Sequence, residues 1–129
     1  MADSMNYCLD TLREIYGDTK RILDLSELND FELTVVLVTR VLGVGVNMGL
    51  EGMLQDEIDG DPKYCNTIKS FERIGAFDVA ALIREGLVLV VKDDDAKALK
   101  RLSKLSSHFF ELEKLCFDRL AKFIHVWRS

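Results

Sequence analysis

The histidines are the first residues to consider for catalysis, because a weak nucleophile needs a base within hydrogen-bond reach. The chain has two, His108 and His125, which lie seventeen residues apart within one helical pattern. That spacing does not put them on a common face, and a Ser, His and acid triad needs three groups that converge. His125, beside Val126 and Trp127, is typical of a partly buried residue at a helix end. We therefore predict that the protein is not an enzyme.

Three aspartates, Asp56, Asp59 and Asp61, carry the oxygen ligands that Ca²⁺ prefers. A calcium loop also needs an acid at its third position and glycine at its sixth. Counted from Asp56, the third position is Ile58, and counted from Asp59, the sixth is Tyr64. The segment is better interpreted as a solvated acidic turn, so we predict neither a metal nor a cofactor.

Five acids occur within the eleven residues from 51 to 61, with no base among them. The ordinary role of such a cluster is solubility, and the alternative is the binding of a cationic surface. For binding, two nearby methionines would supply an adaptable apolar contact. The predicted partner-binding residues are Glu51, Asp56, Glu57, Asp59, Asp61, Met48 and Met53.

Charge is unevenly distributed along the chain. The formal net charge is −5, but residues 1–62 carry −9 and residues 63–129 carry +4. Between Asp24 and Asp61, nine acids face a single base, Arg40. A nucleic-acid-binding protein is expected to present a basic surface, so we expect a basic protein as the partner and no direct contact with nucleic acid. The basic residues that open the last helix are expected to form its solvent face: Lys97, Lys100, Arg101 and Lys104.

Composition places the protein in a reducing compartment. Its three cysteines are odd in number and widely spaced, which argues against a disulfide framework. No basic segment followed by an apolar run opens the chain, and the most apolar stretch, 35–46, is interrupted by Arg40. We predict a cytoplasmic protein with no membrane partner.

Apolar spacing and glycine punctuation predict an all-α single domain, residues 1–129, of about six helices. The run 31–42 is rich in β-branched residues and fits either a buried strand or a helix buried on all sides, and its length favours the helix. Residues 87–91 leave the same two alternatives open. Gly43 and Gly45 predict a break near 43–47. The expected helices are 4–16, a short one near 19–25, 31–42, 48–55, 62–74, 78–90 and 95–126.

The last of these helices has the strongest apolar periodicity in the chain. Unbroken, it would be about 48 Å long at ~1.5 Å per residue, whereas a chain of this length has a radius of gyration of about 14 Å. Either the helix bends near Ser106 and Ser107, or one end projects and packs on a second subunit. The second arrangement predicts a homodimer.

Residues 46–54, Val-Asn-Met-Gly-Leu-Glu-Gly-Met-Leu, are followed by Ile74-Gly75-Ala76 and then by Ala80 and Ala81. This order resembles a bacterial all-helical family with the pattern Val-Asn-x-Gly-Phe-x-x-Tyr-Phe, a loop, a helix that ends in Ile-Gly-Ala, and a helix that opens with small residues. The resemblance covers about 31–91. That family includes an acidic DNA-mimic protein that binds a transcription factor in place of DNA. Asn47 and Gly49 are expected to have a structural role, with direct binding as the alternative.

Taken together, these patterns favour a small acidic binding protein that blocks a basic partner. The partner would be a toxin, neutralised as immunity proteins neutralise toxins, or a DNA-binding regulator occupied by a DNA mimic. The alternative is a helical structural module that builds a homo-oligomer through exposed apolar faces.

Overall fold

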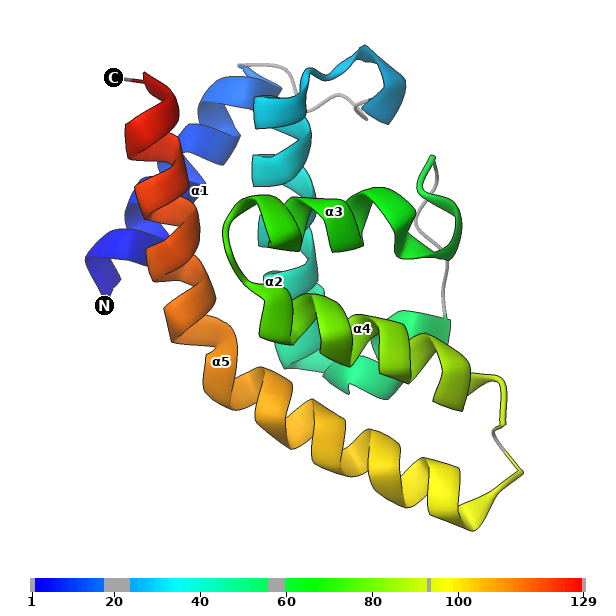
Figure 1. The fold of residues 1–129 in the computed structure, drawn as a ribbon. Helices are drawn as coiled ribbons and strands as arrows, with labels where there is room; N and C mark the ends of the chain where they lie inside the picture. The colour runs from blue at the N-terminus through cyan, green and yellow to red at the C-terminus, as the bar shows by residue number, and fades with distance from the viewer. Residues whose placement is uncertain (1, 18–23, 56–59, 93, 129) are drawn as a thin grey trace.

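A computed structural model of the chain describes residues 2–17, 24–55, 60–92 and 94–128, and backbone alone for 2, 3, 46 and 47 (Figure 1). No residue in these ranges belongs to a strand, so the predicted all-α fold with a long C-terminal helix is confirmed. The described chain forms five α-helices and two 3-10 turns: α1 (Ala2–Tyr16), η1 (Leu25–Glu27), α2 (Asp30–Gln55), η2 (Pro62–Tyr64), α3 (Cys65–Arg73), α4 (Phe77–Val90) and α5 (Ala96–Arg128).

Helix α2 is the centre of the fold, because it contacts α1, α3, α4 and α5. Residues 31–42 are helical throughout, which settles their ambiguous β-branched pattern. Val35, Leu37 and Val38 are fully buried, and a helix covered on every side needs no polar face. Residues 87–90 are likewise helical, within α4.

The predicted break near 43–47 is present as a sharp turn within α2. Its two parts, Asp30–Gly45 and Met48–Gln55, meet at 118°. Gly49 has φ of 76°, a conformation that glycine adopts without a steric penalty. The turn leaves the Leu50 N–H outside the helical hydrogen-bond pattern, and it donates to Ser106 Oγ of α5 at 2.9 Å. Gly49 therefore has the structural role that the sequence predicts.

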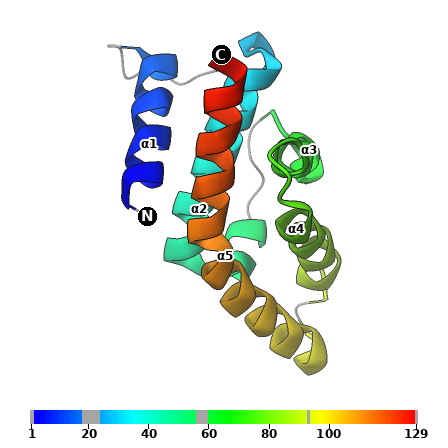
Figure 2. The same ribbon diagram turned by 60° about the vertical axis from the view of Figure 1, so that its left-hand side comes forward.

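Helix α5 curves along its length, as Figures 1 and 2 show, so that its first part runs with α4 and its second part with α1. Close packing at its middle depends on Gly45, where a Cβ atom would overlap the Phe109 ring. The predicted bend near Ser106 and Ser107 falls where α5 crosses the turn of α2, since Ser106 bonds there. Curvature around the core explains how so long a helix fits this chain.

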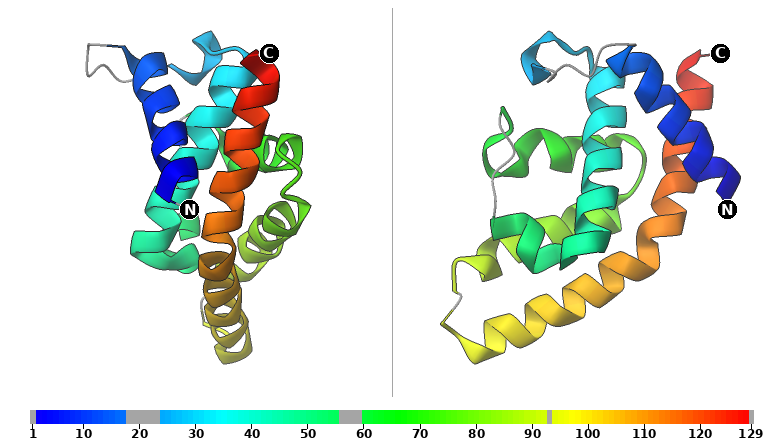
Figure 3. Two further views of the ribbon diagram at one scale, coloured as in Figure 1. Left: turned by 90° about the vertical axis from the view of Figure 1, so that its left-hand side faces the viewer. Right: turned by 180° about the vertical axis from the view of Figure 1, so that it is seen from behind.

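Three aromatic rings meet where α2 begins and α5 ends. Phe31 stacks on Trp127 and Phe123, with ring centroids 5.4 and 6.0 Å apart. Arg128 pairs with Glu14 of α1 beside them. We call Phe31, Phe123 and Trp127 the aromatic end; Figure 3 shows that the chain's C-terminus lies at this end, beside the start of α2.

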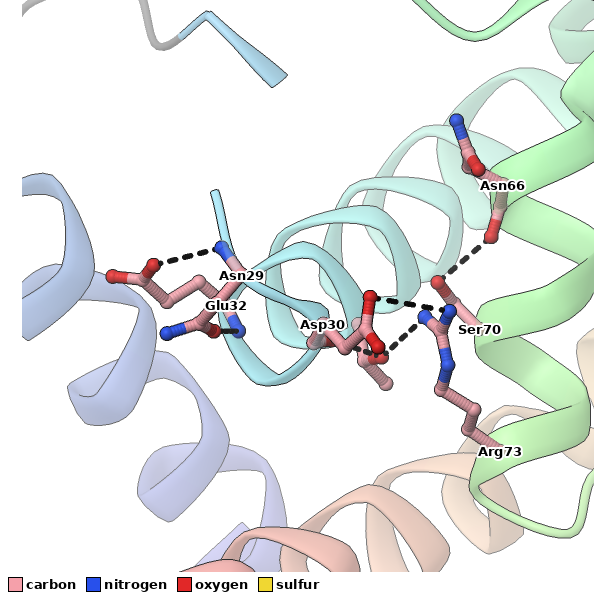
Figure 4. A network of polar contacts seen from close by, with 7 residues as sticks. Asn29, Asp30, Glu32, Asn66, Ser70 and Arg73 are labelled. Atoms are coloured by element: carbon pink, nitrogen blue, oxygen red, sulfur yellow. Dashed lines mark hydrogen bonds and ion pairs between the residues drawn. The ribbon is translucent and has the colours of Figure 1, made fainter. Parts of the chain in front are cut away.

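Local sequence fixes how the helices begin and end. Asn29 and Glu32 form a reciprocal capping box at the start of α2, with bonds of 2.8 and 3.1 Å (Figure 4). Gly75, with φ of 80°, ends α3 in a Schellman motif in which the Ala76 N–H donates to the Phe71 carbonyl at 2.8 Å. The Ile-Gly-Ala sequence is thus a helix stop.

Two predicted helix starts were misplaced. The helix expected from Pro62 begins at Cys65, because Lys63 and Tyr64 of the 3-10 turn η2 adopt left-handed backbone angles. Asp78 is not the N-cap of α4, which is Ala76; it lies within the first turn, where its carboxylate accepts hydrogen bonds from the Val79 N–H at 2.9 Å and from Arg119 at 2.8 Å. Most of the short helix expected near 19–25 lies outside the described residues, which show only η1 there.

No single helix in the described ranges is long and apolar enough to cross a membrane. The two parts of α2 reach that length and composition only when they are taken together across their 118° turn.

Candidate functional site: an apolar groove beside the acidic segment

A groove of about 530 Å³ opens where α2 ends, where α4 ends and at η2. Its volume is in the range of protein binding sites. Its walls are mostly aliphatic, with one amide, one phenol and one ammonium group among them. The lining residues are Leu54, Gln55, Lys63, Tyr64, Leu87, Val88, Val90 and Val91.

The turn at Gly49 and a close helix contact together form the walls. After that turn, the last part of α2 runs to Gln55, and Leu54 packs against α4. Gly86 allows this approach, because a Cβ atom there would come within 2.5 Å of Leu54 Cδ1. Packing that tight fixes the distance between the two walls.

The floor is held by a buried carboxylate. Asp61 Oδ1 accepts from the Asn66 N–H at 2.6 Å, and Oδ2 accepts from the Thr67 N–H at 3.0 Å and its hydroxyl at 2.6 Å. The Tyr64 hydroxyl donates to the Met53 carbonyl at 2.7 Å. These bonds hold Lys63 and Tyr64 at φ of 54° and 57°, where a non-glycine residue costs about 1–2 kcal/mol.

The floor of the groove is buried, and its outer edge, which we call the lip, is exposed. Leu54 and Tyr64 are buried, whereas Val88 and Val91 are 58% and 76% exposed on the outer side of α4. Isolated exposed valines are ordinary on protein surfaces. Here they extend an apolar groove, which makes the lip a candidate contact.

The chain segments next to the groove are acidic. Segments 51–61 and 92–95 together carry eight acids and one base, Lys92. Among the described acids, Glu51, Asp94 and Asp95 have no ion-pair partner. Asp95 Oδ1 accepts the Lys97 N–H at 2.9 Å and the Ala98 N–H at 3.4 Å at the start of α5. In sequence, the segments that flank the groove are therefore net acidic.

The structure divides the seven predicted partner-binding residues. Met48 is 54% exposed and Glu51 is half-buried, so both remain at the surface. Met53 is only 3% exposed and Asp61 is fully buried, so neither is available to a partner. Asp56, Glu57 and Asp59 lie outside the described residues.

The correction for Asp61 has a physical reason, and the sequence contained a signal for it. An aspartate before a proline that opens a helical turn is a typical cap, because its carboxylate satisfies free N–H groups. The signal was hidden because Asp61 ends a run of solvated acids. The valines of the lip were missed because the pattern 87–91 left helix and strand both open.

Six acids elsewhere in the described ranges pair with arginines. Arg73 pairs with Asp30 at 3.5 Å and bonds Thr34 Oγ1 at 3.2 Å, which ties α3 to the start of α2 (Figure 4). Arg101 pairs with Glu85 of α4 through two bonds. Its hydrogen bond lowers the pKa of the Glu85 carboxyl.

The other basic residues at the start of α5 have no such partner. Lys97, Lys100 and Lys104 are exposed, as predicted for a solvent face. The described ranges also contain no group of three or more His, Cys, Asp or Glu side chains placed to hold a metal ion.

The buried cysteines are poor nucleophiles. The Cys8 thiol donates to the Phe117 carbonyl at 3.5 Å. Burial raises the pKa of Cys8 and of Cys116 to about 12, and the neutral thiol is the unreactive form. Cys65 is exposed and unpaired.

Residues 26–127 match the model of the DMP19-like protein family. The chain belongs to this family. The match covers most of the chain and is wider than the predicted 31–91, because it takes in the long α5. Comparison with curated proteins and with solved structures gave no match.

Proposed function

We propose that this DMP19-like protein is a small acidic binding protein that blocks a basic protein partner without catalysis. The observation that carries the proposal is the apolar groove at the end of α4, between two acidic chain segments. Opposite charge accelerates encounter and fixes orientation, while affinity comes from a desolvated apolar contact. The groove supplies the apolar contact, and the acids of the chain segments next to it supply the charge.

The described acids of the flanking segments, apart from buried Asp61, are not neutralised by a cation of the described chain. Glu51, Asp94 and Asp95 lack ion pairs, whereas Asp30, Asp78 and Glu85 are each held by an arginine. A carboxylate already paired within the chain gives little attraction to a second protein, because its field is partly cancelled.

The partner is either a toxin or a DNA-binding regulator. Imitation of a whole DNA duplex would need one negative charge per ~1.7 Å along the duplex axis. The net charge of −5 and the six arginine pairs among the described residues fall short of that density. A local acidic and apolar contact supports blocking of either class of partner.

A second candidate function is a helical module that forms a homo-oligomer. It is favoured by the outer face of α4, where Phe77, Ala81, Val88 and Val91 are all exposed. Their spacing of four, seven and three residues follows one helical stripe. A homodimer built on this stripe would cover the lip of the groove.

Capture from a lysate of the native organism tests the proposed function. The acidic variant replaces Glu51, Asp56, Glu57 and Asp59 by the amides and keeps Asp61, whose carboxylate is structural. The control variant replaces Lys97, Lys100 and Lys104 by Gln. We expect a basic protein that both wild type and control capture and that the acidic variant loses. Capture that survives in the acidic variant, or fails in the control, would show that the acids are not the binding surface.

A further inference from the structure

We infer that the groove receives the apolar face of a basic amphipathic helix of the partner. The inference rests on the proposed function, because it takes the partner to be a basic protein, and it adds where and by what element that partner is held. The evidence for it comes from the shape of the groove, its apolar lining and the charged residues on the neighbouring segments.

The lining fits a row of side chains rather than a single anchor. At the ~30 Å³ that a water occupies in the liquid, about 530 Å³ is room for several apolar groups. Leu87, Val88 and Val91 form one aliphatic wall along the last turn of α4, and Leu54 faces them from α2. Helices bind such grooves through anchors at i, i+3 or i+4, and i+7.

Charge selects a basic helix. Both α2 and α4 end at the groove, and the free carbonyl groups of a helix C-terminus give it about half a negative charge. Glu51, Asp94 and Asp95, all without ion pairs, lie on the segments that border it. An occupant with Lys or Arg beside its apolar stripe satisfies these groups, and an acidic one is repelled.

Lys63 is the one cation among the lining residues, and it makes no ion pair within the described chain. It lies next to the C-terminal turns of two helices, where a cation is stabilised. Its position therefore does not require an anionic ligand. Replacing it by Gln removes a like charge and is expected to tighten a basic helix.

The test uses three synthetic helical peptides and isothermal titration calorimetry. The first has Leu at i, i+3, i+4 and i+7 and Lys elsewhere; the second has Glu for every Lys; the third has the first peptide's composition with the stripe scrambled. We expect the first to bind at least about tenfold more tightly than either of the others, because only it combines the stripe with positive charge.

Variants then locate the contact. Val88→Asp with Val91→Asp should weaken the Leu/Lys peptide at least about tenfold, since both side chains are exposed and the fold does not depend on them. The matched control is Phe110→Asp, which alters a side chain 60% exposed on α5. It should leave binding unchanged. Circular dichroism and urea unfolding confirm that each variant is folded.

Failure of the inference is distinguishable from failure of the proposed function. If the acidic variant loses the Leu/Lys peptide but Val88→Asp with Val91→Asp keeps it, the groove is not the site, although binding through the acids still stands. If the Leu/Glu peptide binds as well as the Leu/Lys peptide, the occupant is not basic and both fail. If the peptides do not bind and the double valine variant turns a dimer into a monomer, a second copy covers the groove, and the inference is overturned.

Discussion

The aromatic end and the groove both expose large apolar side chains near acids, yet they differ in how far the chain satisfies them itself. At the aromatic end, Trp127 is 55% exposed but stacks on Phe31, and nearby Glu14 is paired with Arg128. At the groove, Val88 and Val91 are exposed to solvent, and the nearby described acids have no ion pair. The first arrangement contributes to stability, and the second leaves both apolar surface and charge for another molecule.

The largest expected difference between the two regions is in stability. Phe31→Ala removes a buried ring from a stack of three, and such a change costs about 3–5 kcal/mol in the free energy of unfolding. Val88→Ala alters an exposed side chain and should stay within about 0.5 kcal/mol. Urea unfolding of both variants measures the contrast, and equal losses would mean that the lip is part of the core.

The wall of the groove should be sensitive to a single methyl group. Gly86→Ala places a Cβ atom against Leu54, and overpacking of this kind costs about 1–3 kcal/mol. Gly43→Ala is the matched control, because nothing lies within 4 Å of the added atom, and there helix propensity should stabilise by up to about 1 kcal/mol. Thermal unfolding of the two variants should move in opposite directions; a stabilising Gly86→Ala would contradict the packing described.

Removal of the Tyr64 hydroxyl at the floor of the groove should lower both stability and peptide affinity. Tyr64→Phe removes the donor to the Met53 carbonyl, and a hydrogen bond of this kind contributes about 0.5–1.5 kcal/mol net. Because that bond also helps to hold the left-handed backbone at 63–64, the Leu/Lys peptide should bind more weakly. A variant with wild-type stability and wild-type peptide affinity would show that the hydroxyl does not shape the groove.

Lowering the pH should destabilise the fold mainly by protonating the carboxylates that pair with arginines. Each of these carboxylates contributes little to the free energy of unfolding. Burial tends to raise the pKa of Asp78, but the hydrogen bonds from Arg119 and from the Val79 N–H, together with the charge of Arg119, outweigh burial and the pKa is lowered. A carboxyl with a lowered folded-state pKa stabilises the fold above its unfolded value, and that stability is lost as pH falls through the folded value. Asp78→Asn should therefore flatten the loss of stability below about pH 4, and an unchanged pH dependence in this variant would contradict the account. Unfolding measured from pH 7 to pH 3 checks this.

Periodicity and punctuation predicted most of the fold. Apolar spacing gave α1 and α5, and the glycines gave the break in α2 and the end of α3 at Gly75. These features are local, because a helix face or a positive φ is set by residues a few positions apart. The starts of α3 and α4 were less accurate, because the side chains of Tyr64 and Asp78 form hydrogen bonds with Met53 and Arg119, which lie elsewhere in the chain.

The candidate site was predicted only in part, because it is not local. The acidic segment and Met48 are visible in the sequence, but the groove joins residues near 54, 63 and 88 that meet only after α2 turns. Which acids have arginine partners is also a tertiary property: Asp30 and Arg73 are far apart in the chain. Sequence reasoning therefore pointed to the acidic segment and missed the apolar groove next to it in the chain.

The most direct test of the account is to map the Leu/Lys peptide on the ¹⁵N-labelled protein by chemical-shift perturbation. Binding at the groove predicts shifts concentrated at the amides of 54–55, 63–64 and 87–91, with residues around Phe31 and Trp127 unmoved. Shifts concentrated at the aromatic end, or along the exposed face of α5 at 97–104, would contradict the claim that the groove is the binding site.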